Sequence, residues 1–191
     1  MGAIVVAADR GVDYALALGL RVDVAVGDFD SISVAGLAEL EHSGARVERY
    51  PVGKDASDLE LALDLALSFR PRRILLVGGA GGRLDHLLAE GLLLAAEAYA
   101  GVELDALLGR AAVHVVRGER VLAGRVGELV SLFAVHGVAT GVVSEGLVYP
   151  LRGEALAPGS SRGLSNVFAA SEARVSVQCG VVLAVRPTGG L

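Results

Sequence analysis

Short apolar runs alternate with stretches of helical periodicity from the start of the chain to about residue 117. Apolar runs bounded by polar or glycine residues are typical of buried strands, and apolar residues recurring every three or four positions indicate helices. The predicted strands are 3–8, 22–26, 46–50, 73–77, 102–107 and 112–116. The predicted helices are about 11–18, 34–41, one beginning after Ser57, and 84–99. This order predicts an α/β fold with an N-terminal, mostly parallel sheet flanked by helices.

Beyond Gly118 the pattern changes to short, valine-rich runs separated by glycine, proline or serine, without a convincing helix. Such runs predict a small antiparallel β-sandwich domain. They are 121–122, 129–135, 138–144, 173–178 and 181–186. The sequence therefore predicts two domains, 1–117 and 118–191.

Composition narrows the class of protein. With 53% hydrophobic and 20% charged residues among 191, the chain can bury a packed core. A net charge of −5 without a basic run predicts no nucleic-acid surface. The apolar run at residues 1–8 is too short for a signal peptide or a membrane span, so no membrane contact is expected. A single cysteine, Cys179, excludes an internal disulfide and fits a cytoplasmic location.

Lysine and asparagine occur once each, and such single occurrences invite a chemical explanation. Lys54 is the single lysine in a chain whose other 16 positive charges are arginines, and Asn166 is the single asparagine. A solvated surface lysine is the default interpretation of Lys54, but this chain uses arginine for that purpose elsewhere.

Asp28 and Asp30 follow the predicted strand 22–26 on a glycine turn. In an extended chain, residues two apart point to the same side, so we expect these carboxylates to face one spot. Their like charges repel unless a cation lies between them, and Mg2+ prefers such hard oxygen ligands. The alternative is a surface turn whose acidic side chains face water.

Polar clusters follow each of the first four predicted strands. Asp9 follows the first, Asp28 and Asp30 the second, residues 54–58 the third, and residues 78–86 the fourth. Because ligands bind at the carboxyl ends of strands in open parallel sheets, these clusters are expected to meet at one edge.

The glycine-rich segment 78–83 offers backbone N–H groups and the Arg83 guanidinium to a phosphate. It is neither a Walker A loop nor a dinucleotide fingerprint, and a tight strand-to-helix turn is the simpler alternative. Carboxylates, a lysine, an arginine and a glycine loop together predict a site for a nucleoside triphosphate with Mg2+. Phosphoryl-type transfer requires mainly positioning and charge neutralisation, which fits a chain without a Ser-His-Asp or Cys-His arrangement.

These segments resemble the ordered motifs of the thiamine pyrophosphokinase family. In the first half the matching segments are Asp9-Arg-Gly11, Gly27-Asp-Phe-Asp-Ser31, Lys54-Asp-Ala-Ser-Asp58 and Gly81-Gly-Arg-Leu-Asp-His86. In the second half they are Ser131-Leu132, Gly146-Leu-Val-Tyr-Pro150 and Ser165-Asn166. The resemblance spans nearly the whole chain, and the order of its motifs makes it specific.

The resemblance implies transfer of pyrophosphate from ATP to thiamine, giving thiamine diphosphate and AMP. It implies an α/β catalytic domain at 1–117 that binds nucleotide and Mg2+, and an all-β thiamine-binding domain at 118–191. By resemblance, the Mg2+ ligands are Asp9, Asp28, Asp30 and Asp58. By resemblance, the ATP site is lined by Lys54, Asp55, Ser57, Arg83 and Asp85, with Asp28, Asp30, Asp58 and Arg83 as the catalytic residues. Ser165 and Asn166 are expected to meet thiamine, in a homodimer with sites between its subunits.

Two departures from the family pattern bear on nucleotide contacts. Arg10 stands where the family usually has a small residue, and Glu90 where bacterial members often carry asparagine. Three alternatives stay open: a pyrophosphokinase acting on a pterin alcohol, a non-catalytic nucleotide or thiamine sensor, and a Ser165-Asn166 pair that only shapes a turn.

Overall fold

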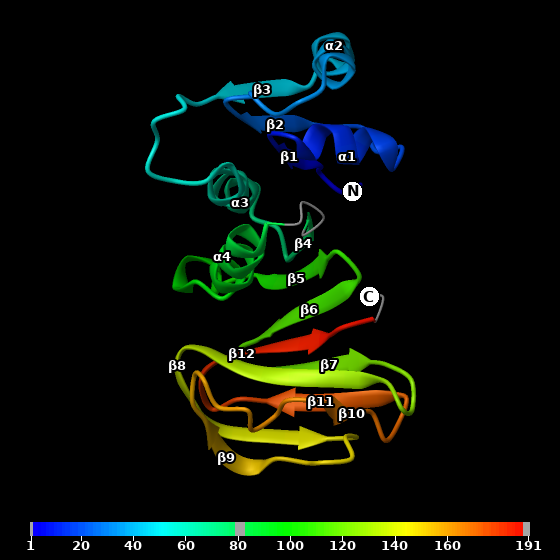
Figure 1. Cartoon of the computed structure of the whole chain (residues 1–191), viewed down its shortest axis with the longest axis vertical. Coiled ribbons are helices and arrows are strands. Elements are labelled where there is room, and N and C mark those ends of the chain that lie inside the picture. Colours follow the sequence, from blue (N-terminus) through cyan, green and yellow to red (C-terminus); the bar gives the residue numbers. More distant parts are fainter. Residues whose placement is uncertain (1, 79–82, 189–191) are drawn as a thin grey trace. The chain divides into compact units, whose positions relative to one another are not determined.

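The computed structural model describes residues 2–78 and 83–188, and the chain divides into two compact units after Pro71. Figure 1 labels the elements of both units. The α/β class predicted from the sequence is confirmed. The predicted boundary between a nucleotide-binding domain at 1–117 and a thiamine-binding domain at 118–191 stays a prediction.

The first unit is a three-stranded parallel sheet with helices on both faces. Its strands, in order, are β1 (Val6–Ala8), β2 (Val24–Gly27) and β3 (Arg46–Arg49). Its helices are α1 (Gly11–Ala17), α2 (Val34–Ser43) and α3 (Asp58–Ser68). All four residues of β2 are buried, because this central strand has a neighbour on each side and helices above and below. The carboxyl ends of β1 and β2 therefore form a supported edge.

Two serines fix where α2 and α3 begin. The Ser33 hydroxyl accepts a hydrogen bond from the Gly36 N–H at 2.9 Å and begins α2. The Ser57 hydroxyl accepts one from the Glu60 N–H at 3.2 Å and begins α3, which confirms the predicted start. The helix start places Asp58 in the first turn of α3.

The second unit is built on one nine-stranded mixed sheet. Its path runs through β4 (Arg73–Gly78), β5 (Glu103–Leu108), β6 (Ala111–Val116), β12 (Cys179–Arg186), β8 (Leu129–Glu145), β11 (Glu172–Ser176) and β7 (Glu119–Ala123). Two further strands, β9 (Arg152–Leu156) and β10 (Asn166–Val167), pair with β8. Helix α4 (Leu84–Leu94) and the short 3-10 helix η1 (Glu97–Tyr99) complete the unit.

The sheet arrangement differs from the prediction. We expected the strands up to residue 116 to share one mostly parallel sheet, but β4 and β5 are the parallel pair of the second sheet. A two-residue turn, with Gly109 at a φ of 62°, joins β5 to β6 and makes them antiparallel. The parallel pair therefore continues directly into the antiparallel part of the sheet.

Strand β8 organises the second unit. The sequence predicted separate strands at 129–135 and 138–144, whereas the structure has one 17-residue strand. His136 and Gly137 have positive φ angles of 59° and 139°, which bend the strand without ending it. Its first half pairs with β12 and its second half with β11 and β9, so its two halves enclose a common core. Figure 1 shows this long, bent strand in yellow-green.

Helix α4 is shorter than predicted, ending at Leu94 instead of about residue 99. The Arg117 side chain donates hydrogen bonds to the carbonyl oxygens of Ala95 and Ala96. These bonds satisfy acceptors that a longer helix would have used, and Ala96 adopts an extended conformation.

A buried aspartate ties four strands of the second unit together. Asp105 of β5 is fully buried and accepts hydrogen bonds from His114 at 2.9 Å, Arg73 at 2.6 Å and Arg120 at 2.8 Å. Burial alone would raise the pKa of Asp105, but the hydrogen bond from His114 and the two guanidinium groups lower it. Asp105 therefore stays ionised and connects β4, β5, β6 and β7.

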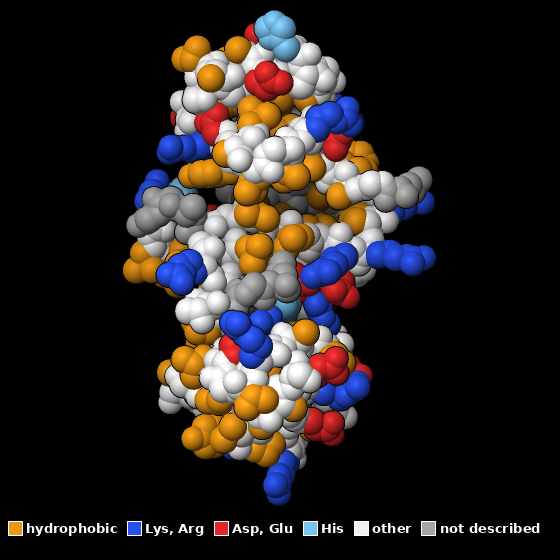
Figure 2. Space-filling view, turned by 90° about the vertical axis from the view of Figure 1, so that its right-hand side faces the viewer, with side chains coloured by type: hydrophobic (Ala, Val, Ile, Leu, Met, Phe, Trp, Pro, Cys, Tyr) orange, Lys and Arg blue, Asp and Glu red, His pale blue; other side chains and the backbone are white. Residues whose placement is uncertain are grey.

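The surface carries charges of both signs among apolar side chains. On the face drawn in Figure 2, lysine and arginine side chains are scattered among acidic and apolar ones. None of the helices in residues 2–78 and 83–188 is long and apolar enough to cross a membrane.

Candidate active site

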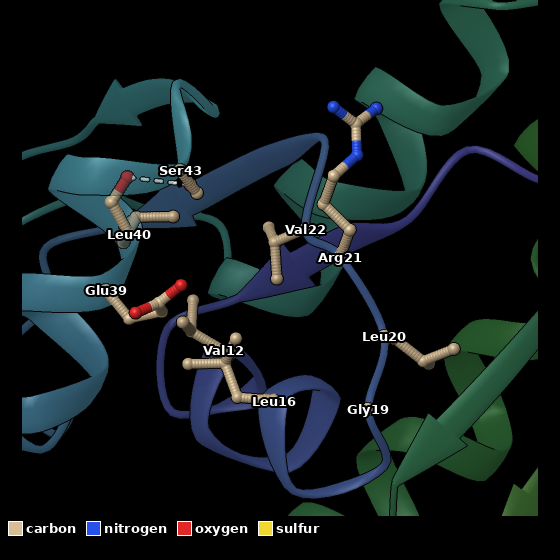
Figure 3. Close-up of a pocket in the computed structure, with 9 residues that line it drawn as sticks. All are labelled: Val12, Leu16, Gly19, Leu20, Arg21, Val22, Glu39, Leu40 and Ser43. Atoms are coloured by element: carbon tan, nitrogen blue, oxygen red, sulfur yellow. Dashed lines mark hydrogen bonds between the residues drawn. The ribbon is translucent and has the colours of Figure 1, made fainter.

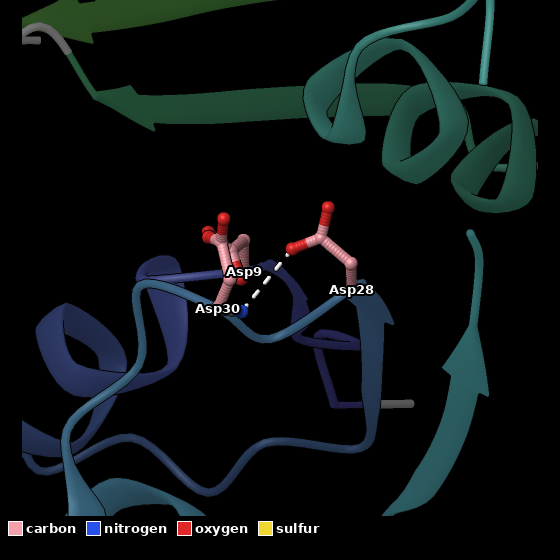
Figure 4. A group of neighbouring side chains, drawn as sticks. All are labelled: Asp9, Asp28 and Asp30. Atoms are coloured by element: carbon pink, nitrogen blue, oxygen red, sulfur yellow. Dashed lines mark hydrogen bonds between the residues drawn. The ribbon is translucent and has the colours of Figure 1, made fainter. Parts of the chain in front are cut away.

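Three aspartates meet at the carboxyl edge of the first sheet. Asp9 follows β1, and Asp28 and Asp30 follow β2; one carboxylate oxygen of each lies within 4.8 Å of the others. Figure 4 shows the three side chains gathered at this edge. The structure thus brings these residues together as the sequence predicted, while their role as cation ligands stays a prediction.

The backbone that brings Asp28 and Asp30 together is not the extended chain assumed from the sequence. Phe29 between them has a φ of 63°, in the left-handed region that bulky residues rarely adopt. The Asp30 N–H donates a hydrogen bond to Asp28 Oδ1 at 3.1 Å, which closes a tight turn. The Phe29 ring is buried in the core, with the Arg49 guanidinium 5.1 Å from its centroid.

Lys54 supplies the positive charge of this site. Its Nζ lies 2.8 Å from Asp58 Oδ1 and 3.3 Å from Asp28 Oδ2, and its side chain is 12% exposed. The hydrogen bond to Asp58, followed by that to Asp28, raises the pKa of Lys54 above its ordinary value. The single lysine of the chain is therefore a fixed cation between two predicted metal ligands.

Gly27 explains how Asp58 reaches this edge. A Cβ atom added at Gly27 would lie 3.2 Å from both Asp58 Oδ1 and Asp9 Cβ, and its φ is 144°. A side chain at this position would press on both aspartates, so glycine permits the close approach of β1, β2 and α3.

The negative charges of Asp28 and Asp30 repel each other. The pKa of Asp28 lies below its ordinary value, because the Asp30 N–H and Lys54 stabilise its charge. The pKa of Asp30 lies above it, chiefly because of the negative charge of Asp28, with burial and Asp9 adding to the shift. Lys54 therefore does not offset the whole negative charge, and a cation next to Asp30 would.

The donor set fits Mg2+. All three groups are carboxylates, the hard oxygen ligands that Mg2+ prefers. Asp9 Oδ1 is buried and has no hydrogen-bond partner among the described residues, which leaves one oxygen for a ligand from outside the chain. Asp9, Asp28 and Asp30 are thus the residues best placed to hold the ion, with Asp58 next to them.

The other predicted nucleotide residues come later in the sequence than Asp9, Asp28 and Asp30. Ser57 caps α3 and Asp55 is exposed. In the second unit, Arg83 precedes α4 and pairs with Asp85, with Nη2 2.6 Å from Oδ2. This pair lowers the pKa of Asp85 to about 2 and raises that of Arg83. Residues 79–82 of the predicted glycine loop lie outside the described residues.

The two departures from the family pattern have local partners. The Arg10 guanidinium lies 6.0 Å from the centroid of the Tyr14 ring. Glu90 of α4 faces the end of β4, with Oε2 3.5 Å from where a Cβ on Gly78 would lie.

Ser165 and Asn166 line a cleft of about 480 Å3 in the second unit. Asn166 is 2% exposed; its Oδ1 accepts a hydrogen bond from the Tyr149 N–H at 3.0 Å, and its Nδ2 donates to the Tyr149 carbonyl at 2.7 Å. The Ser165 N–H donates to Ser131 Oγ at 3.0 Å, and the Ser165 side chain is exposed. Asn166 therefore shapes the cleft wall, and direct contact of this pair with thiamine stays a prediction.

A second cleft, of about 310 Å3, lies in the first unit between α1, α2 and the loop before β2. Figure 3 shows its largely apolar lining, which includes Val12, Leu16 and Leu40. It lies at the start of β2, at the opposite end of the strand from Asp28. None of the predicted site residues lines it.

No role for Ser31 beyond its place in a motif was predicted from the sequence. In the structure its hydroxyl donates a hydrogen bond to Asp9 Oδ2, linking the chain after β2 to the end of β1. A serine next to acidic residues is common in turns, and sequence spacing alone does not reveal this bond.

This site defines a class of protein. Its carboxylates and lysine lie at the carboxyl edge of a parallel sheet, and the chain also has a β unit with a cleft. These are features of an α/β protein with a candidate phosphoryl-transfer site. Two family models match: the thiamin pyrophosphokinase catalytic domain over residues 2–104, and the thiamin pyrophosphokinase vitamin B1 binding domain over residues 113–182. The chain belongs to the thiamin pyrophosphokinase family.

Individual relatives agree with this assignment. The chain is 38% identical to the thiamine pyrophosphokinase of Bacillus subtilis over 97 residues, which are 51% of this chain and 44% of that protein. A crystal structure of the Bacillus subtilis enzyme has a TM-score of 0.85 at 26% identity, covering 98% of this chain and 88% of that one. The thiamin pyrophosphokinase structure from Geobacillus thermodenitrificans has a TM-score of 0.80 at 29% identity, covering 97% and 86%.

Proposed function

We propose that this protein is a thiamine pyrophosphokinase, which transfers the terminal pyrophosphate of ATP to thiamine. The thiamine hydroxyl oxygen attacks the β-phosphorus, the bond from that phosphorus to the α-phosphate oxygen breaks, and AMP leaves. The hydroxyl proton is lost, so the products are thiamine diphosphate and AMP. The observation that carries the proposal is the cluster of Asp9, Asp28 and Asp30 with Lys54, in a chain that both family models match.

In this proposal the acidic cluster binds Mg2+. Asp9, Asp28 and Asp30 would hold the ion together with Asp58, and the bound ion would supply positive charge for the triphosphate. Lys54 remains protonated, because its pKa is raised, and neutralises the inner side of the cluster. Its two ion pairs also orient Asp28 and Asp58.

The nucleotide residues have donors suited to phosphate oxygens. The Ser57 hydroxyl accepts a hydrogen bond from the Glu60 N–H, which leaves its own proton free to be donated. The Arg83 guanidinium is oriented by two hydrogen bonds to Asp85 and keeps other N–H groups for a phosphate. We propose these residues, with Lys54 and Asp55, as the ATP contacts.

The cleft of the second unit suits a cationic ligand. Thiamine carries a fixed positive charge, so an unpaired arginine in its pocket would repel it. Arg162 lines the cleft, but its Nη2 lies 3.0 Å from Glu154 Oε1. The pKa of Glu154 is lowered by backbone hydrogen bonds, chiefly from the Arg152 N–H, and by Arg162, so Glu154 stays ionised and balances the arginine.

Replacing Glu154 with glutamine is expected to raise the thiamine KM about two- to fivefold, the scale of an exposed ion pair. The substitution keeps the shape of the side chain and leaves the Arg162 charge uncompensated near the cleft. Steady-state kinetics with each substrate varied in turn test this prediction. The ATP KM should not change, and Glu172→Gln, which removes an exposed acid from β11, should alter neither constant. An unchanged thiamine KM in Glu154→Gln would contradict the role given to this pair.

One assay distinguishes the proposed reaction from its rivals. The protein is incubated with ATP and Mg2+ plus either thiamine or a hydroxymethylpterin, and the products are separated and identified by mass. Thiamine diphosphate with an equal amount of AMP is the expected result. Stoichiometric ADP would indicate an ordinary kinase, pterin diphosphate alone would indicate the related pyrophosphokinase, and binding without either product would indicate a sensor.

We also propose a homodimer in the cytoplasm. Helix α4 exposes several large apolar side chains, which a subunit contact would remove from water. They are Leu84, Leu87, Leu88 and Leu92. Sedimentation or light scattering of the purified protein tests the dimer.

A further inference from the structure

Ser31 connects two segments that carry the candidate metal ligands. It follows Asp30 directly, and its hydroxyl donates a hydrogen bond to Asp9 Oδ2 across the edge between β1 and β2. The residue is exposed, so its side chain contributes little buried area to the core. Its hydrogen bond is therefore the main contact through which it influences the site.

We propose that Ser31 is a positioning residue for the bound cation, acting through Asp9. The inference rests on the proposed function and assigns a role to a residue that does not itself hold the ion. A hydrogen bond to one carboxylate oxygen fixes the rotation of the whole carboxylate. With Oδ2 engaged by Ser31, Asp9 Oδ1 is left buried and without a hydrogen-bond partner among the described residues, and so available to the ion.

Asp9 needs such a restraint because neither its backbone nor its neighbours favour its position. Its φ of 46° lies in the left-handed region, as does that of Phe29 across the site. The Asp28 and Asp30 carboxylates, within 4.8 Å, repel that of Asp9 when no cation is present. The Ser31 hydroxyl adds an uncharged donor that holds Asp9 in this arrangement, so the ion meets a site that is already formed.

Ser33, in the same loop, has a purely structural role. The Ser33 hydroxyl donates to Asp13 Oδ1 at 2.6 Å and accepts from the Gly36 N–H at 2.9 Å. Within residues 2–78 these bonds fasten the start of α2 to α1 and lead to none of the three clustered aspartates. Ser33→Ala is therefore a matched control, with the same chemical change two residues further along the same loop.

The test measures binding of Mn2+, a spectroscopic probe for the Mg2+ site, by electron paramagnetic resonance without nucleotide or thiamine. Ser31→Ala is expected to weaken Mn2+ binding about 10- to 100-fold, the usual effect of losing such a partner. Its metal-free melting temperature should match that of the original protein. Ser31→Thr keeps the hydroxyl and should restore the affinity. Ser33→Ala should lower the melting temperature and leave the affinity unchanged.

The outcomes separate this inference from the proposed function. If the original protein binds Mn2+ and Ser31→Ala binds it equally well, the positioning role is wrong and the metal site stands. If the original protein does not bind Mn2+ at millimolar concentration, the metal site of the proposed function fails and the inference fails with it. In the enzyme assay, Ser31→Ala should raise the Mg2+ concentration needed for half-maximal rate while kcat at saturating Mg2+ stays close to normal. An equal loss of kcat at all Mg2+ concentrations would overturn the inference.

Discussion

Asp28→Asn is expected to lower kcat by about 100-fold or more while the protein remains folded. Asp28 is the carboxylate that the structure connects most fully within the cluster. One of its oxygens accepts a hydrogen bond from the Asp30 N–H, and the other lies 3.3 Å from Lys54 Nζ. Asparagine keeps the size of the side chain but removes the charge that would attract a cation to the triphosphate.

Stability should change little in this variant, because Asp28 has two opposing effects on the metal-free protein. Its charge raises the pKa of Asp30, so removing it relieves a repulsion, but its own pKa is lowered by the Asp30 N–H and Lys54, so removing it also loses stabilising contacts. Thermal unfolding without metal should show a melting temperature close to that of the original. The control is Glu41→Gln, which removes one negative charge from the exposed face of α2 and should leave kcat unchanged. Near-normal kcat in both Asp28→Asn and Asp30→Asn would remove the metal role from this pair.

The acidic cluster could be predicted from the sequence, but the backbone that forms it could not. The rule that strand ends share an edge depends only on strand order, and it placed Asp9 with Asp28 and Asp30 correctly. The left-handed turn at Phe29 depends on a buried ring packed beneath Arg49 and on a hydrogen bond from Asp30 to Asp28. The contact between Phe29 and Arg49 joins residues 20 apart in the chain, and no local pattern records it.

The strand pairing of the second unit could not be predicted from the sequence pattern, for a similar reason. Apolar runs identify strands but do not name their neighbours. The two-residue turn at Gly109 makes β5 and β6 antiparallel. The bend at His136 and Gly137 does not end the strand, so the two strands predicted there form the single strand β8. Both outcomes depend on backbone conformation at one or two residues, whereas the pattern averages over five or more.

The rarity of a residue in the chain indicated importance without indicating the kind of contact. Lys54 was singled out because it is the only lysine, and it lies between Asp28 and Asp58. Asn166 was singled out for the same reason, yet its amide bonds the backbone of Tyr149. A buried amide satisfies a peptide group as readily as a ligand, so only the structure separates the two roles.

Lys54→Met is expected to lower kcat/KM for ATP by about 100-fold, the scale of losing one positioned charge in a phosphoryl-transfer site. The methionine side chain fills a similar volume but leaves Asp28 and Asp58 without their shared cation. Initial rates at varied ATP and saturating thiamine measure this effect. Arg21→Met is the control, because it removes a cation from an ion pair whose arginine side chain is 77% exposed, and it should leave the rate unchanged.

Lys54 should also affect the stability of the metal-free protein. Removing the lysine leaves three neighbouring carboxylates and Asp58 with uncompensated charge, so the melting temperature without metal should fall. Adding Mg2+ should restore part of this loss, because the ion replaces some of the missing positive charge. Lys54→Arg keeps the charge but replaces a compact ammonium with a planar fork, so its activity should lie between those of the methionine variant and the original. If Lys54→Met keeps near-normal activity and shows no Mg2+-dependent recovery of stability, then Lys54 is not the cation of this site, and the negative charge of the cluster must be neutralised entirely by ligands from outside the chain.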